Sequence, residues 1–174
     1  MTNPLETTWD SFNTVIDSFE VVNRASAMGA TRTTSFQLTK FASASDQQIL
    51  NMLGAAMDQI EEQTVMFVYA KFEAVLRDHL TAQANLLAVA ANPTPQFGLN
   101  LEGWFVELCK ETRMDKVVDL FLPTVPQSKI ADLGVIRKYR HWLAHGKRGP
   151  AVPSVTPLFA YTSLTGFLKA CSLA

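Results

Sequence analysis

Hydrophobic residues recur every three or four positions along most of this chain, which is the spacing of helices that bury one face. The first such stripe covers residues 5–22, and it includes Leu5, Trp9 and Phe19. Gly29 and a Thr- and Ser-rich run then interrupt the pattern, and residues 36–45 read as a loop or short turn. The pattern therefore predicts a first helix that ends before Gly29.

A second and longer stripe begins after Ser45. Ser45 is followed three residues later by Gln48, which is the spacing of a capping box at a helix start. Apolar residues keep a helical rhythm from there to residue 91, so we predict a long helix. Unbroken, such a helix would be roughly 70 Å long, which is far beyond an ordinary small domain. We therefore expect a kink or break at residues 81–85.

The remaining stripes are shorter and are separated by proline and glycine. Residues 92–95 stop the long helix, and the next helices are predicted at residues 101–113 and 116–122. The first of these should turn three apolar side chains toward the core: Trp104, Phe105 and Leu108.

Two further helices complete the prediction. Ser128 is a suitable N-cap for a helix that runs to Leu143 and is closed by Gly146. Thr156 followed by Pro157 is a typical start for a last helix. The fold class that follows is all-α: one helical-bundle domain over residues 1–174 with a long central helix.

The composition indicates one buried core and the compartment in which the chain is expected. The chain has 174 residues, 48% of them hydrophobic, which is enough for one buried core. No apolar run approaches the roughly 20 residues that cross a bilayer, and no secretory leader is visible, so we expect a cytoplasmic protein without membrane contact. Cys109 and Cys171 form no paired motif and are expected to be packing thiols in a reducing compartment.

Charge is distributed unevenly along the chain. Residues 1–128 hold eight Lys or Arg and 15 Asp or Glu, a net charge of −7, whereas residues 129–174 hold seven and one, a net charge of +6. A C-terminal part this basic fits a polyanion such as nucleic acid, and it equally fits docking against the acidic remainder of its own fold.

The basic charge is densest at residues 137–148, which contain five Lys or Arg, two His and no acid. On a helical wheel the core face of this helix is formed by Asp132, Val135, Ile136, Tyr139, Trp142 and Leu143. Arg137, Arg140, His141 and His145 share the polar face. An acidic surface of the same fold, a partner chain or phosphate could balance their charge.

Residues 140–145, with the sequence RHWLAH and a following Gly146, resemble the R-x4-6-H signature of HEPN domains. The resemblance implies a helical bundle that forms a homodimer, with two Arg–His helices lining one cleft. It also implies a metal-independent endoribonuclease that needs no cofactor, such as a toxin or phage-defence effector with a protein antitoxin, for example a nucleotidyltransferase. Residues 69–76 resemble an early helix of these domains, where Glu73 would support the site.

The chemistry of these residue types suits RNA cleavage. His145 can accept the proton of an attacking 2′-hydroxyl, or donate one to the leaving 5′-oxygen, and the Arg140 guanidinium can stabilise the phosphate charge. The product would be a 2′,3′-cyclic phosphate. Arg140 and His145 lie about 140° apart on an ideal helix, so they converge only if a second protomer faces the first or the helix unwinds at Gly146.

The other candidate residues have narrower roles. His141 would orient the substrate or the other protomer, and Arg137, Lys147 and Arg148 are candidate RNA contacts. The last two are alternatively solvated loop charges. Glu73 is alternatively a structural ion-pair partner of Arg140 or Arg137.

Three alternative readings stay open at this stage. Arg140 and His145 could form an intramolecular salt-bridge patch. His141 and His145 could bind zinc with a third ligand, for which the candidates are Glu73, Glu107 and Cys109. His79 is interpreted as a surface or half-buried histidine. The sequence therefore supports two hypotheses: an endoribonuclease, or a non-catalytic HEPN-type module that binds RNA or protein.

Overall fold

The computed structural model describes residues 3–27, 36–90, 95–122 and 124–174, and every regular element in these residues is a helix. The helices are α1 (Glu6–Ala27), α3 (Asp46–Ala90), α4 (Pro95–Glu111), α5 (Met114–Asp119), α6 (Gln127–Ala144) and α7 (Pro157–Ala170). The predicted all-α class and helical bundle are confirmed. The interruptions predicted at residues 29–35 and 92–94 lie outside the described residues.

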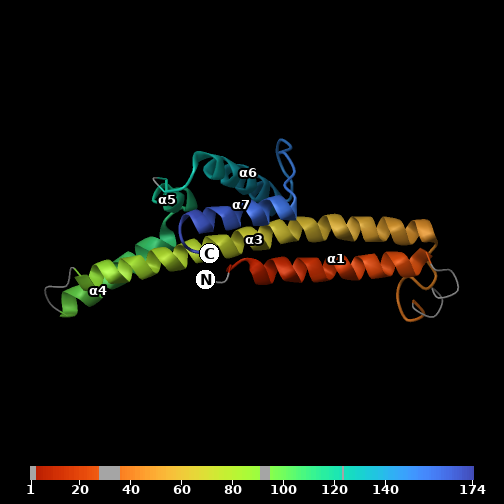
Figure 1. The fold of residues 1–174 in the computed structure, drawn as a ribbon, viewed down its shortest axis with the longest axis horizontal. Coiled ribbons are helices and arrows are strands. Elements are labelled where there is room, and N and C mark those ends of the chain that lie inside the picture. Colours follow the sequence, from red (N-terminus) through yellow and green to blue (C-terminus); the bar gives the residue numbers. More distant parts are fainter. Residues whose placement is uncertain (1–2, 28–35, 91–94, 123) are drawn as a thin grey trace.

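The long helix α3 is the spine of the molecule. Figure 1 shows that it runs the whole length of the structure, with α1 packed antiparallel along its first half and α4 turned back along its second half. Helices α6 and α7 cover the middle of α3, and α5 lies between α4 and α6 (Figure 1). This arrangement places the basic helix α6 over the centre of the spine.

The start of α3 was predicted correctly. The backbone N–H of Gln48 donates to the Ser45 hydroxyl at 3.3 Å, and the Ser45 N–H donates to the Gln48 side chain at 2.8 Å. These reciprocal bonds form the predicted capping box, and they satisfy two amides that have no partner within the helix.

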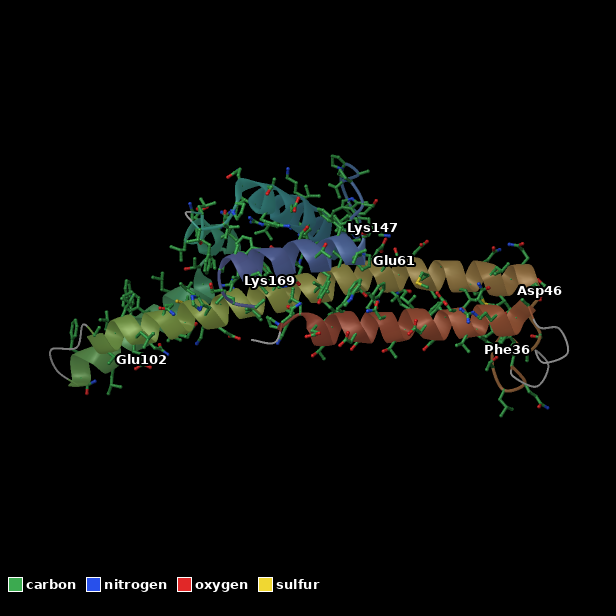
Figure 2. The ribbon with its side chains drawn as sticks, viewed as in Figure 1. Phe36, Asp46, Glu61, Glu102, Lys147 and Lys169 are labelled. Carbon is green, nitrogen blue, oxygen red and sulfur yellow. The ribbon has the colours of Figure 1, made fainter. Side chains whose placement is uncertain are left out.

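The break predicted at residues 81–85 was wrong, because α3 continues as one helix of 45 residues to Ala90. Neither proline nor glycine occurs between residues 81 and 90, and Ala84 and Ala88 are buried where α4 packs along this part. The length argument failed because the molecule is elongated. Figure 2 shows Asp46, at the start of α3, and Glu102, on α4, near opposite ends of the molecule.

Four further expectations require correction. Helix α4 begins at Pro95 instead of residue 101, and its Trp104 is 60% exposed, so Trp104 is not a core residue; Leu108 is also exposed. Ser128 is not the N-cap of α6, since the helix begins at Gln127 and Pro126 precedes it without a side-chain cap. Val135, placed on the core face by the helical wheel, is 41% exposed.

The predicted C-terminal end of α6 and the predicted start of α7 are confirmed. Gly146 follows the C-cap of α6 with φ of 67°, and the amides of Gly146 and Lys147 donate to the carbonyls of Leu143 and Trp142. These two bonds form a Schellman motif, which favours glycine at this position. At the start of α7, the Thr156 hydroxyl accepts from the Phe159 N–H at 3.2 Å, and Pro157 occupies the first turn.

The core joins α3, α6 and α7 where they cross. Its members share near-complete burial and include Tyr69, Phe72 and Leu76 of α3, Leu133, Ile136, Tyr139 and Leu143 of α6, and Leu164, Phe167 and Leu168 of α7. Phe72 and Phe167 meet edge to face with ring centroids 5.3 Å apart. The polar face of α6 is therefore held on well-packed helices, which favours a fixed site geometry.

None of the described helices combines the length and the apolar character needed to cross a membrane.

Candidate functional site

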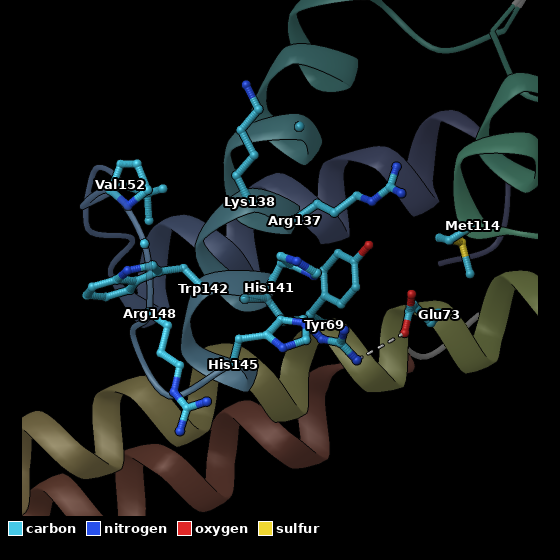
Figure 3. A pocket seen from close by; sticks show the side chains of 14 residues that line it. Tyr69, Glu73, Met114, Arg137, Lys138, His141, Trp142, His145, Arg148 and Val152 are labelled. Carbon is cyan, nitrogen blue, oxygen red and sulfur yellow. Dashed lines mark ion pairs between the residues drawn. The ribbon is translucent and has the colours of Figure 1, made fainter.

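A cleft of about 940 Å³ lies between the polar face of α6, the middle of α3 and the loop that follows α6. Its cationic and titratable lining consists of Arg137, Lys138, Arg140, His141, His145 and Arg148, together with Glu73 and Tyr69 of α3. Figure 3 shows His141, His145 and Tyr69 together at the centre of this cleft, with Arg148 on one side and Glu73 on the other. The fold thus brings the predicted catalytic and supporting residues into one cavity.

Arg140 crosses from α6 to α3. Its guanidinium lies 3.8 Å from the Glu73 carboxylate and 5.6 Å from the centroid of the Tyr69 ring, and both charged side chains are half-buried. The ion-pair distance exceeds that of a hydrogen bond, so Arg140 keeps donors for a further acceptor. The residue is therefore held in place by a carboxylate and an aromatic face while it lines the cleft.

The two histidines of the cleft lie at the end of α6. The ring centroids of His141 and His145 are 4.2 Å apart, and both side chains are exposed. His145 is the C-cap of the helix with φ of −91°, so the regular helix ends at Ala144. Arg140 and His145 both line the cleft of one chain, although they lie about 140° apart on an ideal helix.

The remaining cations form the rim of the cleft. Arg137, Lys138 and Arg148 are exposed, and none of them has an ion pair among the described residues. His145 also has no acidic partner within this part of the chain. Among the residues that the structure describes, Glu73 is the one carboxylate that lines the cleft. The lining therefore carries a strong excess of positive charge, which favours a bound anion.

Lys147 is the predicted site residue that lies outside the cleft. Its ammonium lies 2.6 Å from the Glu62 carboxylate on the other side of the α6 terminus, and it also faces the Trp142 ring. The hydrogen bond to Glu62 raises the pKa of Lys147. Lys147 has a positive φ of 60° directly after Gly146, and the chain lines the cleft again from Arg148 onward.

Tyr69 was not predicted from the sequence as a site residue. It is 1% exposed, and burial together with the nearby Glu73 raises its pKa to about 12, against the opposing effect of Arg137 and Arg140. Among the described residues no hydrogen bond is found to its hydroxyl group, and Tyr69 is one of the residues that line the cleft. Tyr69 precedes Arg140 by some seventy positions, and no local pattern in the sequence relates the two.

The rival residues are scattered. Cys109 is a buried free thiol on α4, and Glu107 pairs with Lys110 on the exposed side of that helix at 3.5 Å. Within the described ranges, no group of three His, Cys, Asp or Glu side chains comes together with metal-binding geometry. His79, on α3, is half-buried beside the ring of Phe121, which agrees with its interpretation from the sequence.

Comparison with known proteins found no match among protein-family models, curated proteins or solved structures.

Proposed function

We propose that this protein is a metal-independent endoribonuclease of the HEPN type, with Arg140 and His145 as its catalytic residues. The observation that carries the proposal is that Arg140, His141 and His145 line one cationic cleft, in which Glu73 is the one carboxylate among the described residues. The resemblance of residues 140–145 to the HEPN signature supports the same reading.

In the proposed reaction, His145 accepts the proton of a ribose 2′-hydroxyl as that oxygen attacks the adjacent phosphorus. Arg140 binds the non-bridging phosphate oxygens and stabilises the charge of the pentacoordinate transition state. The bond from phosphorus to the 5′-oxygen breaks, and this oxygen takes up a proton from the protonated His141 or from solvent. The products are a 2′,3′-cyclic phosphate and a 5′-hydroxyl.

The rim cations would bind the flanking backbone. Arg137 and Arg148 lie at the mouth of the cleft without acidic partners among the described residues, which leaves them available to phosphates on either side of the cleaved bond. Lys147, paired with Glu62, is not available in the same way. A cytoplasmic toxin or defence effector, held in check by a protein antitoxin such as a nucleotidyltransferase, is the biological role that this activity would serve.

The experiment is incubation of the purified chain with RNA in the presence of EDTA. We expect cleavage that leaves 2′,3′-cyclic phosphate ends, and a loss of roughly 100-fold or more in rate for Arg140→Ala and for His145→Ala. Lys169→Ala and His79→Ala are matched controls, because they remove a cation and an imidazole outside the cleft. The absence of cleavage by wild-type protein, or equal losses in the controls, would refute the proposal.

A second protomer that faces the cleft is part of the proposal, since it would add its own Arg140 and His145. Mixing Arg140→Ala with His145→Ala protein tests this part separately. A composite site regains cleavage in mixed dimers, because one intact arginine and one intact histidine meet there. The absence of any recovery would show that each chain contains its own complete site.

The second candidate function is a non-catalytic module that binds RNA or protein through the same cleft. The ion pair between Arg140 and Glu73 favours it, because the arginine already has an anionic partner within the fold. This candidate predicts stable RNA binding without turnover and an affinity that His145→Ala leaves unchanged. Binding retained together with a large loss of cleavage in that variant would exclude it.

A further inference from the structure

One end of the α3–α4 pair extends beyond α5 and the rest of the bundle, as Figure 1 shows. Helix α3 ends there at Ala90, and α4 begins there at Pro95. The sequence of this end is unusual, because residues 80–101 contain no Asp, Glu, Lys, Arg or His, whereas 18% of the whole chain is charged. The projecting end therefore lacks the charged side chains that normally cover a surface in water.

Large apolar side chains are exposed at this end on both helices. Five of them form what we call the hairpin tip: Leu86, Leu87 and Val89 of α3, and Phe97 and Leu99 of α4. Their exposed fractions range from 49% for Phe97 to 73% for Val89. Apolar side chains that gather on the surface of a chain in this way mark a contact with a protein or with a membrane.

The arrangement of these side chains around the two helices favours a membrane over a protein. On each helix a buried small residue, Ala88 or Gly98, lies between two exposed apolar residues of the hairpin tip. The residues before and after one position lie about 160° apart around a helix, so the apolar side chains occupy both edges of the pair. A docked protein covers one face and leaves the opposite edge in water, whereas lipid surrounds an inserted tip and covers both edges.

The position of Trp104 fits the depth of such an insertion. Trp104 is exposed, follows Phe97 by seven residues on nearly the same side of α4, and lies roughly 10 Å further from the end of the pair. Segments that lie in the membrane interface bury apolar side chains by roughly 5–10 Å, and tryptophan is enriched at the boundary between headgroups and acyl chains. A tip inserted to this depth places Trp104 at that boundary.

The charges nearest to the tip indicate which lipids it suits. The charged residues of α4 are three acids and one base, a net charge of −2, and all of them follow residue 101: Glu102, Glu107, Lys110 and Glu111. Anionic headgroups would be repelled by this charge, whereas zwitterionic headgroups would not. The cations of the chain are densest on α6 and in the loop after it, which do not belong to this end.

We infer that the hairpin tip inserts into the surface of a zwitterionic lipid bilayer and anchors the chain there as a peripheral protein. The expectation of no membrane contact rested on the lack of an apolar run long enough to cross a bilayer, and shallow insertion needs no such run. The inference does not depend on the proposed ribonuclease activity.

The test is flotation of the full chain with phosphatidylcholine vesicles in about 0.5 M salt, which screens any attraction between lipid and the cationic cleft. We expect the wild-type protein to float with the vesicles. Leu86→Asp and Leu99→Asp should each weaken vesicle binding by about tenfold or more, because the new carboxylate would have to leave water. Val21→Asp, at a similarly exposed apolar position on α1, is the matched control and should bind as the wild type does.

Far-UV circular dichroism of each variant must match the wild type, so that a loss of flotation reports on lipid contact alone. Wild-type protein that stays out of the vesicle fraction overturns the inference, and a dimer that Leu86→Asp dissociates in sedimentation velocity would then assign the tip to a second copy. Binding that requires phosphatidylserine and disappears at the same high salt also overturns it, because the cationic cleft would then contact the lipid. Binding that both substitutions leave unchanged overturns it as well, since the contact would lie on another face.

Discussion

Arg140 and Glu73 face each other across the boundary between α6 and α3, with a guanidinium nitrogen 3.8 Å from a carboxylate oxygen. The two residues lie far apart in the sequence, and their contact joins the basic helix to the spine of the fold. Because both are half-buried and line the cleft, a bound anion would compete with Glu73 for Arg140. Glu73 thus reduces the net positive charge of the cleft lining.

The first prediction concerns this competition. Glu73→Gln should tighten binding of an uncleavable 2′-deoxy oligonucleotide by several-fold, on the order of 1 kcal/mol, because a negative charge leaves the cleft. Fluorescence anisotropy measures the affinity. Glu20→Gln, on the exposed surface of α1, is the control and should have no effect. Weaker binding by Glu73→Gln would mean that the carboxylate is needed to position Arg140.

The second prediction concerns the salt dependence of RNA binding. Four Lys or Arg side chains among the described residues line the cleft, namely Arg137, Lys138, Arg140 and Arg148. If each neutralises one phosphate of a single strand, the logarithm of the affinity should fall with the logarithm of salt concentration with a slope of about −3.

Single substitutions then distinguish the cations that line the cleft from cations that lie outside it. Arg137→Ala should reduce the slope by about 0.7, whereas Lys147→Ala should leave it unchanged because Lys147 is paired with Glu62 outside the cleft. A reduced slope in Lys147→Ala would show that this lysine contacts RNA, as the sequence alone suggested.

The third prediction concerns the turn that ends α6. Gly146 has φ of 67°, where a side chain is strained, so Gly146→Ala should lower the free energy of unfolding by about 1 kcal/mol. Gly54→Ala, within α3 and with open space around its Cα, should raise it by up to about 1 kcal/mol. Urea denaturation measures both. If both substitutions changed the free energy of unfolding by the same amount in the same direction, the strain expected for a side chain at Gly146 would be contradicted.

The fourth prediction concerns Tyr69 at alkaline pH. Its pKa is raised to about 12, whereas an unfolded chain releases this proton near pH 10. Stability is therefore unaffected by this group below pH 10 and is lost as the pH rises from 10 toward 12, because only the unfolded state ionises.

Tyr69→Phe removes the ionisable group. Between pH 9 and pH 11, the free energy of unfolding of this variant should fall by about 1 kcal/mol less than that of the wild type. Chemical denaturation at the two pH values measures the difference, and the value at pH 9 serves as the internal reference. Identical losses for the two proteins would show that the Tyr69 hydroxyl ionises normally.

The features predicted correctly from the sequence are those set by neighbours along the chain. The capping box of Ser45 and Gln48, the glycine turn at Gly146 and the Thr156 cap each depend on contacts within a few residues. The presence of Arg140, His141 and His145 on one polar face follows from helical periodicity in the same way. Interactions between residues close together in the sequence are enough to determine such features.

The features that were missed depend on the tertiary arrangement. Helix α3 continues past residue 85 because α4 packs along it, and Trp104 is exposed because no other described helix covers that side of α4. Tyr69 enters the cleft from α3, and Lys147 leaves it toward Glu62. In each case the deciding partner lies far away in the sequence, so the periodicity of one segment contains no information about it.

The single helix α3 carries part of the cleft and part of a second groove, of about 470 Å³, between α3, α4 and α5. Glu73, Leu80 and Leu87 are spaced seven residues apart, so they lie nearly in line on one face of the helix over about 20 Å. The same face therefore changes from the wall of the cationic cleft to the wall of the groove, where Leu80 and Leu87 lie. Insertion of one residue between Glu73 and Leu80 would rotate the following part of α3, together with α4, by about 100° and separate the two surfaces. The continuity of α3 is thus what sets the orientation of the groove relative to the cleft.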